Sequence, residues 1–229
     1  MAKAGPPSGL CRQRRGTAPQ MRGRYPDHDV LAQADHWDEA TRRIVLARLR
    51  IDAPPLRVFD ADEGATLEAF CDTVMAQDSD PRVPVLGMID EKLHAGRLEG
   101  YRYADMPADA DAWKLVARGL DEAALEHGCV SFATAPHDAR SQTCGAFSTG
   151  ELCGGVWDEL PIGRAWTVVM RDVVAAFYSH PWAWNEIGFG GPAYPRGHAR
   201  LGVGLRDAWE ADEEFSVDPV ADVPARGLE

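Results

Sequence analysis

Apolar residues recur at helical spacing along most of this chain, and this pattern limits the fold more than any other feature of the sequence. The clearest segment has the i, i+3, i+4, i+7, i+8 spacing of a helix with one buried face: Leu67, Phe70, Cys71, Val74 and Met75. On this stripe Cys71 is expected to act as a small buried hydrophobe. Similar spacing predicts further helices that begin near Asp35, Pro84, Pro107 and Pro161.

The helix expected after Pro161 is the longest, and we place Arg171 and Asp172 off its apolar face. Only short runs such as 57–59 have strand character, and strands do not alternate with helices as a parallel sheet requires. The sequence therefore predicts a mostly α fold, an irregular multi-helix domain with long Pro/Gly-rich loops and extended tails.

Charge separates the two ends of the chain from its middle. Residues 1–24 hold six basic residues and no acid, whereas 206–229 hold eight acids and two arginines. We expect a basic flexible tail and an acidic C-terminal tail, mobile or ordered on a partner, around one helical domain at 25–205. The net charge of -12 argues against nucleic-acid partners, and no apolar stretch is long enough for direct membrane insertion.

Candidate catalytic and metal-binding patterns are weak. The five cysteines and seven histidines form no C-x-x-C or C-x-x-H pair, so we expect no metal site. A disulfide between Cys144 and Cys153 is left open by their spacing of nine residues across a Gly-rich loop. The neighbouring carboxylates of Asp90 and Glu91 are interpreted as solvated charge on a helix face, and no G-x-S-x-G elbow is present.

The aromatic segment, residues 180–201, differs from the rest of the chain. Its tryptophans, glycines and prolines predict irregular structure, and its three glycines at 188–191 lack the preceding strand of a phosphate-binding loop. Two interpretations remain open for Trp182, Trp184, Phe189 and Tyr194. They fill the core of the chain itself, or they dock on another protein, since Trp, Tyr and Arg dominate protein–protein hot spots.

This segment carries a family resemblance. The motifs HPWAW at 180–184 and GFGGPAYPRG at 188–197 resemble those of the gluconate 2-dehydrogenase subunit 3 family, small subunits of bacterial flavin-dependent sugar and sugar-acid dehydrogenases. The likeness extends to TLEA at 66–69, DPRVP at 80–84 and GYRYADMP at 100–107.

The resemblance implies a non-catalytic chain that binds, matures and stabilises a larger FAD-dependent subunit of the glucose-methanol-choline type. FAD is then expected in that partner and no cofactor in this chain, with electrons passing through the partner to a cytochrome c or another acceptor. The residues expected at the partner interface are Trp182, Trp184, Asn185, Phe189, Tyr194 and Arg196.

Two alternatives come from other functional classes. One is a self-sufficient enzyme in which His180, Glu186 or His198 is an acid–base residue. The other is a free-standing helical regulator. The twin arginine at 14–15 lacks the apolar stretch of an export signal, so we expect a cytoplasmic protein. The alternative location is the periplasm or cell envelope, as part of a co-exported complex.

Overall fold

The computed structural model describes residues 28–49, 55–77, 82–97, 100–195, 197, 207 and 209–210. Helices hold 61% of these residues and none of them forms a strand, so the mostly α fold is confirmed. Within the same residues, no helix has the length and apolar character needed to cross a membrane. The basic tail at 1–24 and most of the acidic tail lie outside the described residues.

The described α-helices are α1 (Glu39–Ala47), α2 (Ala61–Val74), α3 (Val85–His94), α4 (Asp109–Glu126), α5 (His137–Thr149), α6 (Ile162–Phe177) and α7 (Pro181–Ile187). Two short 3-10 helices, η2 (Val30–His36) and η3 (Gly155–Asp158), accompany them. The chain divides into two compact units: unit 1 combines 1–49 with 180–229, and unit 2 is 50–179. The single helical domain predicted at 25–205 has no internal boundary, because local sequence patterns do not show that two distant stretches build one unit.

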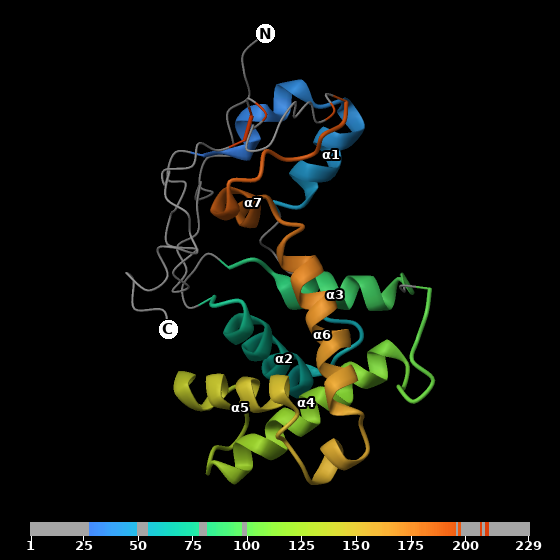
Figure 1. Cartoon of the computed structure of the whole chain (residues 1–229), viewed down its shortest axis with the longest axis vertical. Coiled ribbons are helices and arrows are strands. Elements are labelled where there is room, and N and C mark those ends of the chain that lie inside the picture. The colour runs from blue at the N-terminus through green and yellow to red at the C-terminus, as the bar shows by residue number, and fades with distance from the viewer. Residues whose placement is uncertain are drawn as a thin grey trace. The chain divides into compact units, whose positions relative to one another are not determined.

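Unit 2 is a bundle of α2 to α6 (Figure 1), and aromatic side chains contribute to its core. In it α2 packs against α3, α4 and α5, and α6 packs against α3, α4 and α5. Phe70 from α2 contacts Trp113 from α4 and Phe147 from α5, with ring centroids 6.4 and 6.1 Å apart. A capping box fixes the start of α2, where Asp60 and Glu63 each accept the other's backbone N–H. Four of the five residues predicted for the apolar stripe are buried, Cys71 included, and Val74 is half-buried.

Helix boundaries depart from the predictions at two places. Asp35 lies inside η2, and the residue that caps α1 is Asp38, which accepts a hydrogen bond from the backbone N–H of Thr41 at 2.9 Å. Helix α5 is not among the predicted helices, because only three of its residues are buried: Thr143, Cys144 and Phe147. A face that narrow leaves little apolar periodicity to detect.

Asp90 on α3 is buried, so its interpretation as solvated charge is wrong. Its carboxylate accepts the backbone N–H groups of Arg57 and Val58 at 2.8–3.0 Å. The run 57–59 therefore forms a bend held by a side chain rather than a strand. Glu91, the next residue, is exposed as expected.

Asp172 on α6 is also buried, contrary to its predicted position off the apolar face. One carboxylate oxygen accepts from Lys92 Nζ at 2.9 Å, and the other accepts from the indole N–H of Trp113 at 3.2 Å. This carboxylate joins α3, α4 and α6, and it satisfies two donors inside unit 2.

Cys144 and Cys153 are free thiols, so the disulfide that the spacing left open is not formed. Cys144 lies buried on α5 and Cys153 is exposed in the loop after it. Burial raises the pKa of Cys144 to about 12 and that of Cys71 well above its usual value.

Because the thiolate is the nucleophile, iodoacetamide at mildly alkaline pH should alkylate Cys153 long before Cys71 and Cys144. Peptide mass mapping during a time course measures the three rates. The buried pair should react only after denaturant is added, and alkylation of Cys144 as fast as Cys153 in the native protein would contradict this arrangement.

Candidate partner-binding site

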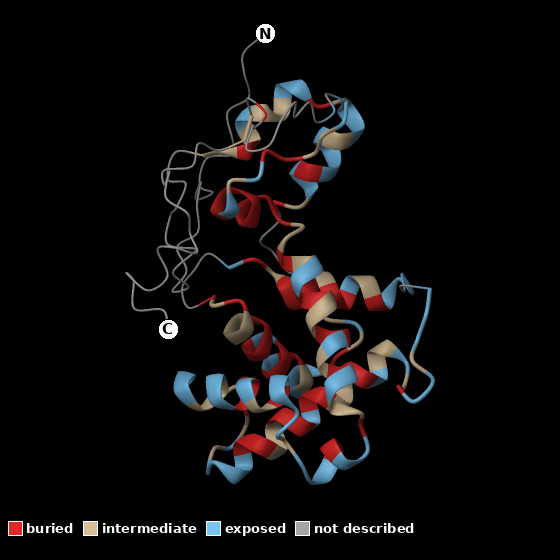
Figure 2. Cartoon of the chain, viewed as in Figure 1, coloured by how far each residue is buried: buried red, intermediate tan, exposed pale blue. Residues whose placement is uncertain are grey.

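The first part of the aromatic segment is helical, which corrects the prediction of irregular structure throughout. Pro181 occupies the first position of α7, where its missing N–H costs nothing. His180 caps the helix, and its Nδ1 accepts the backbone N–H of Trp182 at 3.2 Å. Gly188, at φ 70°, ends the helix in a left-handed conformation that suits glycine. Figure 2 shows α7 buried over most of its length.

Buried side chains of α7 anchor it within unit 1. Trp184 is 6% exposed and shares a hydrophobic cluster with Val30, Trp37 and Val45. Asn185 is also buried, and its side-chain oxygen accepts the backbone N–H of Val30 at 2.8 Å. Trp182 is buried as well. These contacts place Trp184 and Asn185 in the interior of unit 1, and for Trp184 this agrees with the first of the two open interpretations.

The glycines after α7 allow close packing. A Cβ on Gly190 would lie 2.5 Å from the ring of Trp209, and a Cβ on Gly191 would lie 2.7 Å from Val30. Both distances are shorter than van der Waals contact, so only glycine fits at these positions. Trp209 belongs to the stretch expected to be an acidic tail, and the structure instead packs it against the aromatic segment.

Two predicted interface residues remain accessible. Phe189 is 38% exposed and Tyr194 is 64% exposed. Phe189 rests edge-on against Trp184, with centroids 5.7 Å apart, and its backbone oxygen hydrogen-bonds His28 Nε2 at 3.1 Å. Arg196, the sixth predicted residue, lies outside the described residues. The segment thus combines a buried anchor with exposed aromatic side chains.

The proposed acid–base residues of the enzyme alternative are not gathered on an open surface. His180 and Glu186 are both buried, and His198 lies outside the described residues. Across the part of the chain that the structure describes, no group of three or more His, Cys, Asp or Glu side chains is placed to hold a metal ion.

One of three comparisons with known proteins supports the resemblance. Searches among curated proteins and among solved structures find no match to this chain. The family model described as gluconate 2-dehydrogenase subunit 3 matches residues 61–191, from the first residue of α2 to Gly191 beyond α7. This match covers more than half of the chain, and the chain belongs to the gluconate 2-dehydrogenase subunit 3 family.

Proposed function

We propose that this chain is the non-catalytic small subunit of a FAD-dependent sugar or sugar-acid dehydrogenase, which binds, matures and stabilises the larger catalytic subunit. The observation that carries this proposal is the family match, since the family is named for a subunit of a dehydrogenase complex. Such a subunit implies a larger catalytic partner. FAD, the sugar hydroxyl that is oxidised and the route to a cytochrome c or another acceptor belong to that partner.

The anchored aromatic segment supports a docking role. Exposed Phe189 and Tyr194 follow a helix in which every residue except Ile187 is buried, so the start of this loop is held before a partner arrives. A pre-ordered loop loses less conformational entropy on binding than a flexible one. Burial of two aromatic side chains contributes about 25 cal/mol per Å² of apolar area before ordering costs are subtracted. Arg196 would pair with a carboxylate of the partner and fix the register of docking.

Affinity pull-down of the tagged chain from its native cells tests the proposal. We expect a second, larger polypeptide in the eluate, together with the absorbance spectrum of an oxidised flavin. The eluate should oxidise a sugar, polyol or sugar acid with an artificial electron acceptor, and the chain purified alone should not.

A colourless chain that elutes alone would contradict the proposal and favour a free-standing regulator. Turnover by the isolated chain would favour the self-sufficient enzyme with His180 and Glu186. The cytoplasmic location stays a prediction, and fractionation of the native cells measures it directly.

A further inference from the structure

A cavity of about 290 Å³ in unit 2 lies between the C-terminal end of α2 and the start of α5. Its polar lining comprises Asp72, Thr73, Gln77, Arg82, His137 and Arg140. This volume is near the lower limit of small-molecule pockets. Two arginines and a histidine around one cavity are notable in a chain whose net charge is -12.

One wall of the cavity is fixed by a buried amide. Gln77 is 2% exposed, its side-chain oxygen accepts the backbone N–H of Val83 at 2.8 Å, and its nitrogen donates to the Val83 carbonyl at 3.1 Å. The same nitrogen donates to Asp72 at 3.0 Å, and Asp72 forms an ion pair with Arg82. Arg82 is therefore held at the cavity by its neighbours, and Asp72 offsets its charge.

Arg140 faces the same cavity without such a carboxylate. Its Nε is buried and has no hydrogen-bond acceptor, and among the described side chains none forms an ion pair with it. By contrast, Arg164 pairs with Asp105 and Arg171 pairs with Asp109. The Nε atom itself is closed to solvent, so an anion in the cavity would bind the Nη end of the guanidinium and offset its charge.

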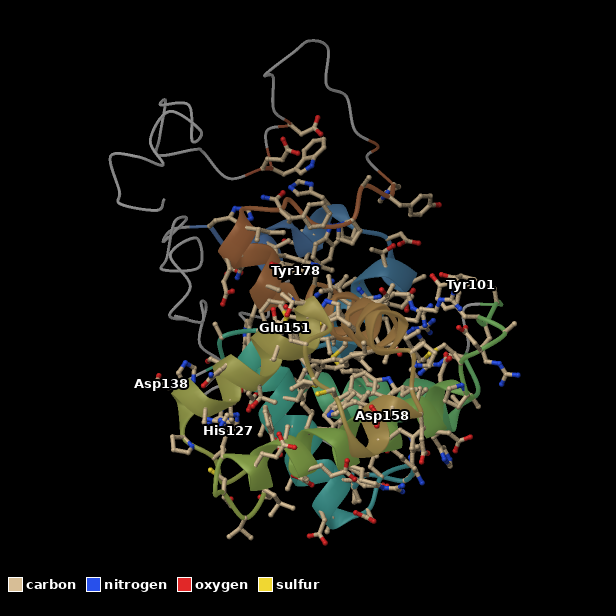
Figure 3. The ribbon with its side chains drawn as sticks, turned by 60° about the horizontal axis from the view of Figure 1, so that its bottom comes forward. Tyr101, His127, Asp138, Glu151, Asp158 and Tyr178 are labelled. Atoms are coloured by element: carbon tan, nitrogen blue, oxygen red, sulfur yellow. The ribbon has the colours of Figure 1, made fainter. Side chains whose placement is uncertain are left out.

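The start of α5 adds to the positive potential. No side chain caps this helix, so its first backbone N–H groups are available at the positive end of the helix dipole. Asp138 in the first turn is exposed and does not line the cavity, and Figure 3 labels it at the outer end of α5. Among the described lining residues, Asp72 pairs with Arg82, and Arg140 adds a further positive charge.

We propose that this cavity binds a small oxyanion, a molecule that presents a carboxylate or a phosphate group to Arg140. The planar guanidinium suits either group, because both offer two oxygens to its parallel N–H donors. The site lies on unit 2 and does not depend on the proposed partner of the aromatic segment.

Isothermal titration calorimetry of the full chain tests the site, with inorganic phosphate and malonate as separate probes in a chloride buffer of constant ionic strength. We expect saturable binding of at least one probe, and the probe that binds identifies the group. Arg140→Gln should weaken that binding by about tenfold or more, since it removes a charge-assisted contact. Arg140→Lys keeps the positive charge but loses the two parallel N–H donors of the guanidinium. Its affinity for the probe should therefore lie between those of the wild type and Arg140→Gln.

Arg118→Gln is the matched control, because Arg118 is exposed on α4 outside the cavity and the change removes the same charge. It should leave the affinity unchanged. Absence of saturable binding by both probes would overturn the proposal, and so would equal weakening by Arg118→Gln and Arg140→Gln. Far-UV circular dichroism verifies the fold of each variant, and Arg140→Lys carries the test if Arg140→Gln does not fold.

Discussion

Replacement of Asp172 by alanine is expected to lower the free energy of unfolding of unit 2 by about 3 kcal/mol. The carboxylate is fully buried and accepts hydrogen bonds from Lys92 and Trp113. Alanine removes both acceptors, so the indole N–H of Trp113 loses its hydrogen bond inside the core. The lower end of the usual range applies because the Lys92 side chain is 23% exposed and keeps access to water.

Asp105→Ala is the control for this prediction. Asp105 also forms an ion pair in unit 2, with Arg164, but both side chains are about half exposed. Exposed pairs contribute less than about 1 kcal/mol, so this variant should stay close to the wild type. Hydrogen exchange of peptides from α4 and α6 during urea unfolding reports unit 2 by itself. An equal decrease in the free energy of unfolding for Asp172→Ala and Asp105→Ala would show that the burial of Asp172 does not increase its contribution to stability.

The apolar pattern itself contained a signal for Asp172. Ala165, Val168, Val169 and Val173 are buried on α6, and Asp172 occupies the i+7 position of the series that starts at Ala165. The spacing from Ala165 therefore places Asp172 on the buried stripe, whereas a stripe that starts one residue later, at Trp166, leaves Asp172 off it. A carboxylate within a buried apolar stripe predicts hydrogen-bond donors close to it. Here the donors are Lys92 on α3 and Trp113 on α4.

Other features could not be obtained from local patterns. The start of α7 had a local signal, since Pro181 favours the first helical position, yet the aromatic and glycine content outweighed it. Asp90 is different, because its partners are the amides of Arg57 and Val58 more than thirty residues earlier. Unit 1 likewise joins stretches from opposite ends of the chain, and its contact between Val30 and Asn185 spans 155 residues. Pairings at that separation are set by tertiary packing.

The second large effect is expected at Trp184, where substitution tests the anchor of the aromatic segment. Trp184→Ala should destabilise unit 1 by about 3–5 kcal/mol, because it leaves a cavity in the hydrophobic cluster that Trp184 forms with Val30, Trp37 and Val45. Unit 1 would then fail to present Phe189, and flavoprotein recovered per tagged chain from native cells should fall. The substrate preference of the complex that still assembles should not change, since the proposed chemistry belongs to the partner.

Tyr194→Ala separates docking from folding. Tyr194 is 64% exposed, so its loss should change the stability of unit 1 by no more than about 0.5 kcal/mol. If Tyr194 contacts the partner as a hot spot, flavoprotein recovery should nevertheless fall about tenfold or more. Tyr101→Ala is the matched control, a tyrosine of 62% exposure in unit 2, and should leave recovery unchanged.

The three variants together locate the interface. Loss of recovery from Trp184→Ala alone would mean that the segment contributes only to the fold of unit 1. If flavoprotein recovery falls for Tyr101→Ala and not for Tyr194→Ala, the interface lies on unit 2. We expect both Trp184→Ala and Tyr194→Ala to lower flavoprotein recovery, and only Tyr194→Ala to keep the stability of the wild type. That result would show that buried Trp184 positions exposed aromatic side chains that contact the partner.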